Sequence, residues 1–529
     1  MSSANTDEGI VPNAKRLLWA GFMAILAAGV GFALRGGIFG TWAAEYGFTA
    51  TQLGLIGGAG FTGFCFGIII GGVIVDKLGY GKLVALALLG HVLSAVVTFC
   101  ASTPENAYNY LYVGMFIFAY ANGTLEAVAN PLVATVFPQK RMHYLNILHA
   151  SWPLGMVVGA LASYVLGSVL HLGWKGQLAF YLVPTVAYAI MFMGQSFPKS
   201  EAAEKGASLA EMLKDVGILG AIVACYLLAV FFGDVLGKFG ISNAPTIGNI
   251  IGAVLVIAVG VITRFSLGSV LLFVLFITHG LVGAVELGTD GWIESITGNL
   301  FTADQGKMLF IWTSAIMFGL RFCAHFIETR LGFTPVSLLF TAAGVAFVGL
   351  TLASGMQTFP LALVALGIYA LGKTFFWPTM LAVVGDRFPR SGAVAMSIMG
   401  GIGMLSAGMI GGPGLGYSKD RFASEALKEK NPALYEQSKA ATESKFLFLA
   451  GVNAIDGKKL EESKTAVKEN KATDDNKAIV EANQAGDRAT LKADSYIPAT
   501  MAIIYLLLCV YFKAIGGYKP VSISEQNAA

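Results

Sequence analysis

The chain of 529 residues is 55% hydrophobic and only 13% charged, whereas a soluble globular protein carries about 25% charged residues. Its formal net charge of +3 is too small to favour an acidic macromolecular partner. This composition excludes a soluble enzyme, a nucleic-acid-binding protein and a disordered scaffold. It indicates an all-α membrane protein whose main partner is the lipid bilayer.

Apolar runs of about 20 residues are long enough to cross a bilayer as helices. Fourteen such runs occur, and in chain order they cover 17–45, 50–75, 82–102, 107–137, 142–172, 176–197, 215–237, 246–263, 267–298, 305–330, 334–355, 358–387, 391–417 and 497–515. An even number of spans places both ends of the chain on the same side of the membrane.

The order of these spans predicts the domain organisation. The expected segments are a six-helix bundle (1–197), a linker with two extra transmembrane helices (198–266), the first five helices of a second bundle (267–417), a polar insert (418–496) and the last helix with its tail (497–529). The insert is rich in Ala, Lys and Glu, which is typical of an exposed helix or hairpin. We interpret it as a solvated spacer rather than a binding domain.

Basic residues on the short connections predict the orientation of the chain. Lys15, Lys140, Arg264 and Arg387 fall on alternate connections, which are therefore expected to be cytoplasmic. Both termini are then cytoplasmic. The insert is external or periplasmic, because long segments cross the membrane regardless of their charge. We expect a multi-pass monomer in the cell (inner) membrane.

The connection between the second and third spans has the pattern G-x-x-x-D-K-x-G-x-x-K, in which the glycines allow a tight turn. The equivalent connection of the second half keeps an acid, a base and a glycine in the same order. Two copies at equivalent positions predict two six-helix halves. The residues expected to gate the cytoplasmic side are Gly72, Asp76, Lys77, Gly79, Lys82, Glu328 and Arg330.

This loop resembles the signature loop of the major facilitator superfamily. The resemblance covers nearly the whole chain, apart from the two extra helices and the insert. It implies two six-helix bundles around a central cavity that opens alternately to each side of the membrane.

The fourth and fifth spans resemble the fucose permease-like sugar:proton symporters within that superfamily. The matching positions are Gly123, Glu126, Asn130, Pro131, Pro138, Leu145, Asn146 and Gly155, with Pro378, Gly400 and Gly401 in the second half. The resemblance implies a sugar substrate and makes Glu126 a protonatable group in the cavity. The first span departs from that group, because residues 32–40 contain Arg35 and no acid, which leaves an anionic substrate open.

Charged side chains deep in apolar spans are costly and therefore indicate function. Arg35 and Glu126 lie in spans expected to be neighbours, and we expect them to pair. In the second half, the acids Glu286, Asp290 and Glu294, spaced by four residues, are expected to meet Lys373, with Arg321 as the alternative base. Each pair is either a static salt bridge or the site of an acid that exchanges a proton. The proton-coupling candidates are Glu126, Arg35 and Glu286.

Amide, imidazole and indole side chains recur at helical spacing near these charges. Amides and imidazoles hydrogen-bond hydroxyl groups, and an aromatic face stacks on the apolar side of a sugar ring. His91 and His279 are interpreted as hydrogen-bonded core residues. The expected substrate-binding residues are Asn130, Asn146, His149 and Trp152 on one wall, and Asp290, Trp292, Arg321, Lys373 and Trp377 on the other.

These features favour a secondary transporter that imports a sugar together with a proton. One alternative is a transporter of an organic or sugar-acid anion, which would contain a buried base without an acidic partner. Another is a membrane sensor with a transporter-like body. No span carries a metal-ligand cluster or a nucleotide motif, so we expect no metal, no cofactor other than the coupling proton and no enzymatic activity.

Overall fold

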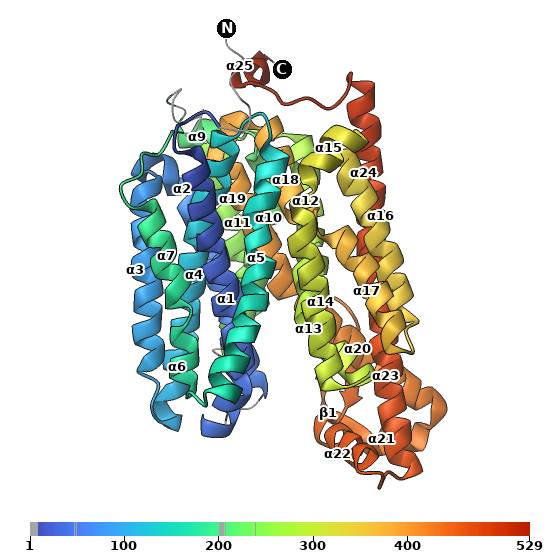
Figure 1. The fold of residues 1–529 in the computed structure, drawn as a ribbon. Helices are drawn as coiled ribbons and strands as arrows, with labels where there is room; N and C mark the ends of the chain where they lie inside the picture. The colour runs from blue at the N-terminus through green and yellow to red at the C-terminus, as the bar shows by residue number, and fades with distance from the viewer. Residues whose placement is uncertain are drawn as a thin grey trace.

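In the computed structural model, two helical bundles stand side by side and a smaller unit extends from one of them (Figure 1). Helix α1 begins at one end of the molecule, which is called here the terminal end. The short helix α25 (Ile523–Ala528) lies at the same end. The insert lies at the opposite end, called the insert end (Figure 1). The structure describes residues 9–46, 48, 50–199, 206, 208–238 and 240–528.

Small residues allow the helices of the amino-terminal bundle to pack closely. A Cβ atom on Gly67 of α2 would collide with the backbone of α4, and one on Gly123 of α4 would collide with the backbone of α2. Close backbone contact of this kind is the usual means of helix association in a bilayer. The elements are α1 (Ala14–Tyr46), α2 (Ala50–Leu78), α3 (Tyr80–Phe99), α4 (Pro104–Val136), α5 (Arg141–Ser163), the π-helical turn η1 (Tyr164–Val169), α6 (Trp174–Ala179) and α7 (Leu182–Phe192).

The sixth expected span, 176–197, is interrupted between α6 and α7. Pro184 has no amide hydrogen to donate to the carbonyl group of Phe180, and this missing bond explains the break. The buried Tyr181 lies in the gap and donates its hydroxyl hydrogen to the backbone oxygen of His91 at 2.7 Å. The turn between α6 and α7 is therefore fixed against α3.

The two extra helices pack as a pair beside the bundles. They are α10 (Gly217–Lys238) and α11 (Ala244–Ile262), which follow the short α9 (Leu209–Met212). The ring of Phe231 on α10 lies 5.6 Å from that of Phe66 on α2, and α10 also contacts the second bundle. The pair thus covers one side of the seam between the bundles. Most of the polar stretch 198–208 lies outside the described residues.

The carboxy-terminal bundle contains several helices broken by π-helical turns. A Cβ atom on Gly283 would collide with the carbonyl oxygen of Gly403, so two of the broken helices touch through their backbones. Breaks of this kind are frequent at functional sites. The elements are α12 (Val270–Val282), η2 (Gly283–Gly288), α13 (Thr289–Leu300), α14 (Ala303–Arg321), α15 (Ala324–Leu331), α16 (Pro335–Ser354), α17 (Phe359–Lys373), α18 (Phe376–Arg387), η3 (Pro389–Ser391), α19 (Gly392–Ser406), η4 (Ala407–Gly411), α20 (Gly412–Lys430) and α24 (Tyr496–Ala514).

The prediction of a multi-pass, all-helical membrane protein is confirmed, but the number of spans differs. Among the described residues, twelve helices are long and apolar enough to cross a membrane, or thirteen if the bent pair α14–α15 forms one span. That pair bends by 53°. The difference from fourteen arises from this bend and from the break between α6 and α7, neither of which changes the apolar composition of the segment.

The insert is a folded unit with its own small core. Helix α20 continues into it, and α21 (Pro432–Ser438), β1 (Lys439–Ser444), β2 (Val452–Ile455), α22 (Gly457–Lys468) and α23 (Asp474–Asp494) follow. The two strands form an antiparallel hairpin. Leu427, Tyr435 and Ile479 are among the buried residues of the core.

The insert is also docked on the second bundle through buried polar groups. Asp487, which is 0% exposed, forms an ion pair with Lys419 (Nζ to Oδ1, 2.8 Å) and accepts a hydrogen bond from Asn299 Nδ2 at 3.2 Å. Asp494 accepts a hydrogen bond from the hydroxyl group of Thr289 at 2.6 Å. These contacts correct the interpretation of the insert as a solvated spacer.

Candidate functional site

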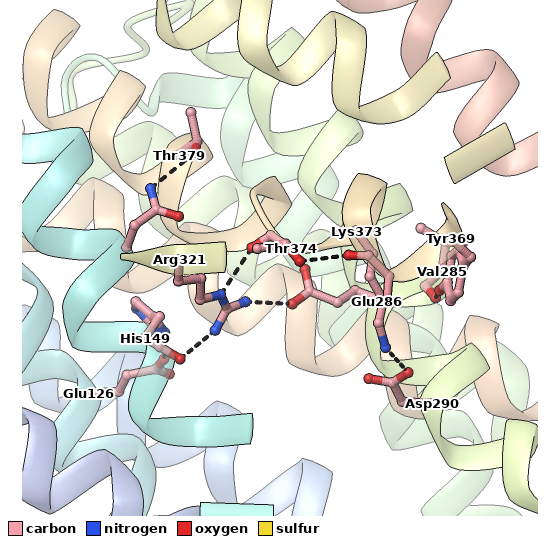
Figure 2. Close-up of polar contacts among 12 residues, drawn as sticks. Glu126, His149, Val285, Glu286, Asp290, Arg321, Tyr369, Lys373, Thr374 and Thr379 are labelled. Atoms are coloured by element: carbon pink, nitrogen blue, oxygen red, sulfur yellow. Dashed lines mark hydrogen bonds and ion pairs between the residues drawn. The ribbon is translucent and has the colours of Figure 1, made fainter. Parts of the chain in front are cut away.

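Polar side chains from both bundles meet in a buried cluster, and Figure 2 labels all of its members except Asn130. All its side chains are buried except that of Asp290, which is partly exposed. We call this set the central cluster; it comprises Glu126 and Asn130 from α4, His149 from α5, Glu286 from η2, Asp290 from α13, Arg321 from α14 and Lys373 from α17.

In the amino-terminal bundle, the two ring nitrogens of His149 have different partners. Nε2 lies 2.8 Å from the side-chain amide of Asn130, and in the orientation in which Oδ1 faces the ring, a neutral His149 carries its hydrogen on Nε2. Nδ1 lies 3.6 Å from Glu126 Oε1. A ring lone pair would then face a carboxylate oxygen unless a proton sits on one of them. In that orientation the contact between Glu126 and His149 is attractive only when it holds one added proton.

Arg321 connects the two bundles. Its Nη1 donates to the backbone oxygen of His149 on α5, and its Nε donates to the backbone oxygen of Thr374 at 2.9 Å. Its Nη2 lies 3.1 Å from Glu286 Oε1. Figure 2 shows the guanidinium group between His149 and Glu286. All three of its nitrogens are thus engaged.

The second ion pair of the cluster joins Lys373 and Asp290. The Lys373 ammonium group also lies 5.2 Å from the centre of the Tyr369 ring, and Tyr369 donates its hydroxyl hydrogen to the backbone oxygen of Val285 at 2.7 Å. The acidic residues of this span thus use both of the bases considered for them: Lys373 pairs with Asp290, and Arg321 pairs with Glu286. The four-residue spacing put Glu286 and Asp290 on one face, where each meets a different base.

Arg35 does not reach Glu126, so the predicted pair of the first half is wrong. Its Nη1 donates to the backbone oxygen of Gly31 and its Nη2 to Ser94 Oγ, each at 3.2 Å. The guanidinium carbon lies 3.7 Å from the centre of the Phe118 ring. Phe118 precedes Glu126 by eight residues on α4, which is about 12 Å along a helix. Arg35 thus holds α1, α3 and α4 together.

Several buried polar atoms in and around the cluster have no hydrogen-bond partner among the residues that the structure describes. They are Glu126 Oε2, Asn130 Nδ2, Asn146 Oδ1, Glu286 Oε2, Trp377 Nε1 and both ring nitrogens of His279. Buried polar groups normally have a partner, so such a set indicates bound water or a polar ligand.

His279 is the residue that sequence reasoning missed. It is 0% exposed, and its ring lies 4.6 Å from the Trp377 ring, centre to centre. It was interpreted as a hydrogen-bonded core residue, which the structure contradicts. His91 does behave that way, since it contacts the Tyr188 hydroxyl at 3.0 Å and Asn122 Oδ1 at 2.7 Å. A lone histidine in an apolar span gives no sequence signal that separates these two cases.

Two more of the predicted binding residues, Asn146 and Trp152, lie outside the central cluster as defined above. Asn146 Nδ2 donates to the backbone oxygen of Met142 at 2.8 Å and lies 3.4 Å from Thr379 Oγ1, across the bundles. Trp152 is half-buried against Phe32, with 5.4 Å between ring centres.

Trp292 lies outside the central cluster. Its Nε1 donates to the backbone oxygen of Gly412 at 3.0 Å, and Lys419 Nζ lies 5.5 Å from the centre of its ring. It therefore supports the start of the insert.

The predicted gating loop forms the tight turn between α2 and α3. Gly79 has φ +85°, which favours glycine. A Cβ atom on Gly72 would collide with the Ser397 side chain, so α2 packs closely on α19 of the other bundle. Lys77 and Lys82 are exposed and Asp76 is half-buried. In the second half, the short helix α15 carries the half-buried Glu328 and the exposed Arg330.

An ion pair between the bundles lies elsewhere at the terminal end. Arg141 Nη1 lies 3.0 Å from Asp386 Oδ1, and the hydroxyl group of Tyr518 donates to Asp386 Oδ2 at 2.8 Å. Sequence reasoning used the charged turns at 138–141 and 386–390 for orientation only. These two turns occupy equivalent positions in the two halves of the chain, and this equivalence could have indicated that they meet.

A metal site has no support among the side chains of the described residues. No group of three or more His, Cys, Asp or Glu side chains in that part of the chain is placed to hold a metal ion.

Comparison with known proteins places the chain among membrane transporters. Its residues 21–413 match the model of the Major Facilitator Superfamily. It is 28% identical over 164 residues to the niacin transporter NiaP of Acinetobacter baylyi, covering 31% of this chain and 36% of that one. It is 32% identical over 129 residues to the L-fucose-proton symporter of Escherichia coli, covering 23% of this chain and 29% of that one.

The alignments to these curated relatives thus span only about a third of the relatives' length. Among solved structures, this chain resembles the major facilitator transporter FucP in the outward conformation, with a TM-score of 0.55 and 17% sequence identity. That match covers 78% of this chain and 92% of FucP. The likeness at this identity concerns the fold. The chain belongs to the Major Facilitator Superfamily.

Proposed function

We propose that the protein is a proton-coupled symporter of a neutral, polyhydroxylated molecule the size of a small sugar. The observation that carries the proposal is the contact between Glu126 and His149. As the ring is placed, this contact is attractive only with one added proton. A transporter can use such a contact to take up a proton together with its substrate.

The charge balance of the central cluster supports a neutral substrate. Arg321 is paired with Glu286, and Lys373 is paired with Asp290. Among the described residues, no arginine or lysine lies within ion-pair distance of Glu126. A carboxylate substrate would have to displace one of the two paired acids before it met a base. A proton on the Glu126–His149 contact instead leaves the cluster neutral overall.

The partnerless atoms support hydroxyl groups on the substrate. Asn130 Nδ2 is a donor, Asn146 Oδ1 is an acceptor, and His279 offers one of each. A hydroxyl group is both a donor and an acceptor, so it can satisfy any of these atoms. The Trp377 ring beside His279 offers an aromatic face for the apolar side of a sugar ring.

Alternating access requires contacts between the bundles that can break. The ion pair of Arg141 and Asp386 closes the terminal end, and the bond from Arg321 to the His149 carbonyl group crosses the bundles at the cluster. Because His149 also contacts Glu126, the protonation of Glu126 and the crossing contact act on the same residue. This shared residue would couple the proton to the movement of the bundles.

An organic anion is the second candidate substrate. It is favoured by the similarity to the niacin transporter, whose named substrate carries a carboxylate group. Arg35 is a buried base without a carboxylate partner among the described residues, as this alternative requires. Its guanidinium group is covered by Phe118, however, and it lies apart from the central cluster.

Uptake into proteoliposomes tests the proposal. Neutral sugars, sugar acids and niacin would be offered with and without an inward proton gradient. The wild type is expected to accumulate a neutral sugar only with the gradient, and less as the outside pH is raised. Glu126→Gln is expected to lose accumulation but keep exchange of labelled for unlabelled sugar, because Gln mimics a permanently protonated acid. Glu294→Gln is the matched control, since Glu294 is exposed.

Three results would contradict the proposal in distinct ways. Gradient-driven accumulation by Glu126→Gln would assign the proton to another group. Accumulation of acids alone would favour the organic anion. Binding without flux in any condition would leave a membrane sensor with a transporter-like body.

A further inference from the structure

A strongly apolar loop joins the two strands of the insert. It covers residues 445–451, with the sequence Lys-Phe-Leu-Phe-Leu-Ala-Gly, and is called here the hairpin tip. Phe448 is 87% exposed, and Leu447 and Leu449 are 45% and 40% exposed. Loop tips in contact with water normally carry Gly, Asn, Asp or Ser. Three consecutive large apolar residues therefore need an explanation.

The base of the hairpin tip is held firmly by the rest of the insert. The Phe446 ring packs on the buried Tyr417, with 6.0 Å between ring centres. Tyr417 donates its hydroxyl hydrogen to the backbone oxygen of Ala450 at 2.7 Å. The amide of Leu449 donates to the backbone oxygen of Phe446 at 2.9 Å. The exposed side chains thus project from a fixed support.

The backbone at Leu447 adds an independent indication. Its φ of +49° lies in the left-handed region, which glycine or asparagine occupies more readily than leucine. A turn chosen for its backbone alone would carry one of those residues. The leucine indicates that the position requires an apolar side chain.

The hairpin tip lies at the depth where membrane spans end. Phe446 and Leu447 line a cavity of about 630 Å³ together with residues of both bundles and of α10, among them Phe61, Tyr108, Val235 and Gly408. Tyr108 lies in the first turns of α4 and Val235 in the last turn of α10. Both helices are apolar enough to cross a membrane. The tip therefore stands beside the insert-end turns of two spans.

We propose that the hairpin tip inserts Leu447, Phe448 and Leu449 into the interfacial layer of the lipid bilayer at the insert end. The neighbouring α10 and α11 are peripheral and expose apolar side chains, among them Tyr226 and Ile250. The tip lies beside the insert-end turn of α10.

An ion pair at the base of the tip fits the same arrangement. The side chain of Lys445 is 72% exposed, and its Nζ lies 3.4 Å from Glu443 Oε2 at the base of the tip. Apolar and aromatic residues flanked by a lysine are the usual composition of an interfacial anchor. The insert is thus tied to the membrane as well as to the second bundle.

Spin labels test which medium surrounds the tip. Phe448→Cys and, as a matched control, Lys458→Cys on α22 would each be made in a chain whose five native cysteines are replaced. The labelled proteins would be placed in nanodiscs of phosphatidylethanolamine and phosphatidylglycerol. Collisions with oxygen, which concentrates in lipid, would be compared with collisions with a water-soluble nickel chelate. We expect oxygen to dominate at position 448 and the nickel chelate to dominate at position 458.

A second labelled position keeps the test decisive. A label on Leu449→Cys should also favour oxygen, and the added change Phe448→Lys should shift it towards the nickel chelate. Equal behaviour at positions 448 and 458 would place the tip in water and overturn the proposal. An immobile label protected from both reagents would mean that protein covers the tip, which would also overturn it.

Discussion

Replacing Arg321 by methionine should destabilise the protein strongly. Arg321 is 2% exposed and bonds to His149, Thr374 and Glu286. The change would leave Glu286, which is 4% exposed, without its cation. Breaking a buried ion pair from one side costs about 3–5 kcal/mol. We therefore expect Arg321→Met to lower the free energy of unfolding by about that amount.

Removing both charges should be milder than removing one. In the double variant Arg321→Met with Glu286→Leu, no buried charge is left alone, so most of the loss should be recovered. The four proteins form a double-mutant cycle, in which two single losses of about 4 kcal/mol each and a double loss of about 2 kcal/mol give a coupling energy of about 6 kcal/mol. Unfolding in mixed micelles with increasing SDS would measure each free energy. The double variant should still fail to transport, because the contact across the bundles is absent.

The reasoning would be refuted by additive effects. A coupling energy below about 0.5 kcal/mol would mean that Arg321 and Glu286 do not depend on each other. A stable, fully active double variant would mean that the contact across the bundles has no part in transport.

Three further predictions concern positions outside the central cluster. Arg35→Met should lower stability by about 2 kcal/mol through the lost hydrogen bonds and ring contact, yet leave proton-coupled uptake intact; loss of coupling in a folded variant would contradict its structural assignment. Asp386→Asn should weaken the contact with Arg141 and open the terminal end, raising the labelling of cysteines placed there; unchanged labelling would argue against this ion pair as a gate. Gly283→Ala should abolish or slow transport because its Cβ atom meets the Gly403 carbonyl group; wild-type rates would show that the two helices separate freely.

The sequence predicted most of the spans, because hydropathy is encoded locally. A run of about 20 apolar residues forms a helix in a bilayer whatever its neighbours are. A buried charge within such a run stands out in the same way, which is how Glu126, Glu286, Arg321 and Lys373 were found.

The partners of these charges could not be predicted from the same pattern. Helical spacing places residues on one face of a helix but does not say which neighbour that face meets. Arg35 and Glu126 were expected to pair, yet Phe118 and Ser94 receive Arg35. The choice between Arg321 and Lys373 for Glu286 depends on the rotation of three helices, which only the packed structure specifies.

Long-range contacts at the ends of the spans were also beyond the sequence. Arg141 and Asp386 are separated by 245 positions in the sequence. Each lies in a charged segment that looks like an ordinary connection between two spans. The insert reads as an exposed helix because its surface is charged. Its core is small and is formed by residues far apart in the chain, such as Leu427 and Ile479.

The central claim is that the Glu126–His149 contact takes up a proton when substrate binds. The most direct test adds substrate to the purified protein in weakly buffered solution and follows the pH with an indicator dye. The wild type should take up about one proton per bound substrate, whereas Glu126→Gln should bind substrate and take up none. Equal proton uptake by the two proteins would contradict the account and move the coupling proton away from Glu126.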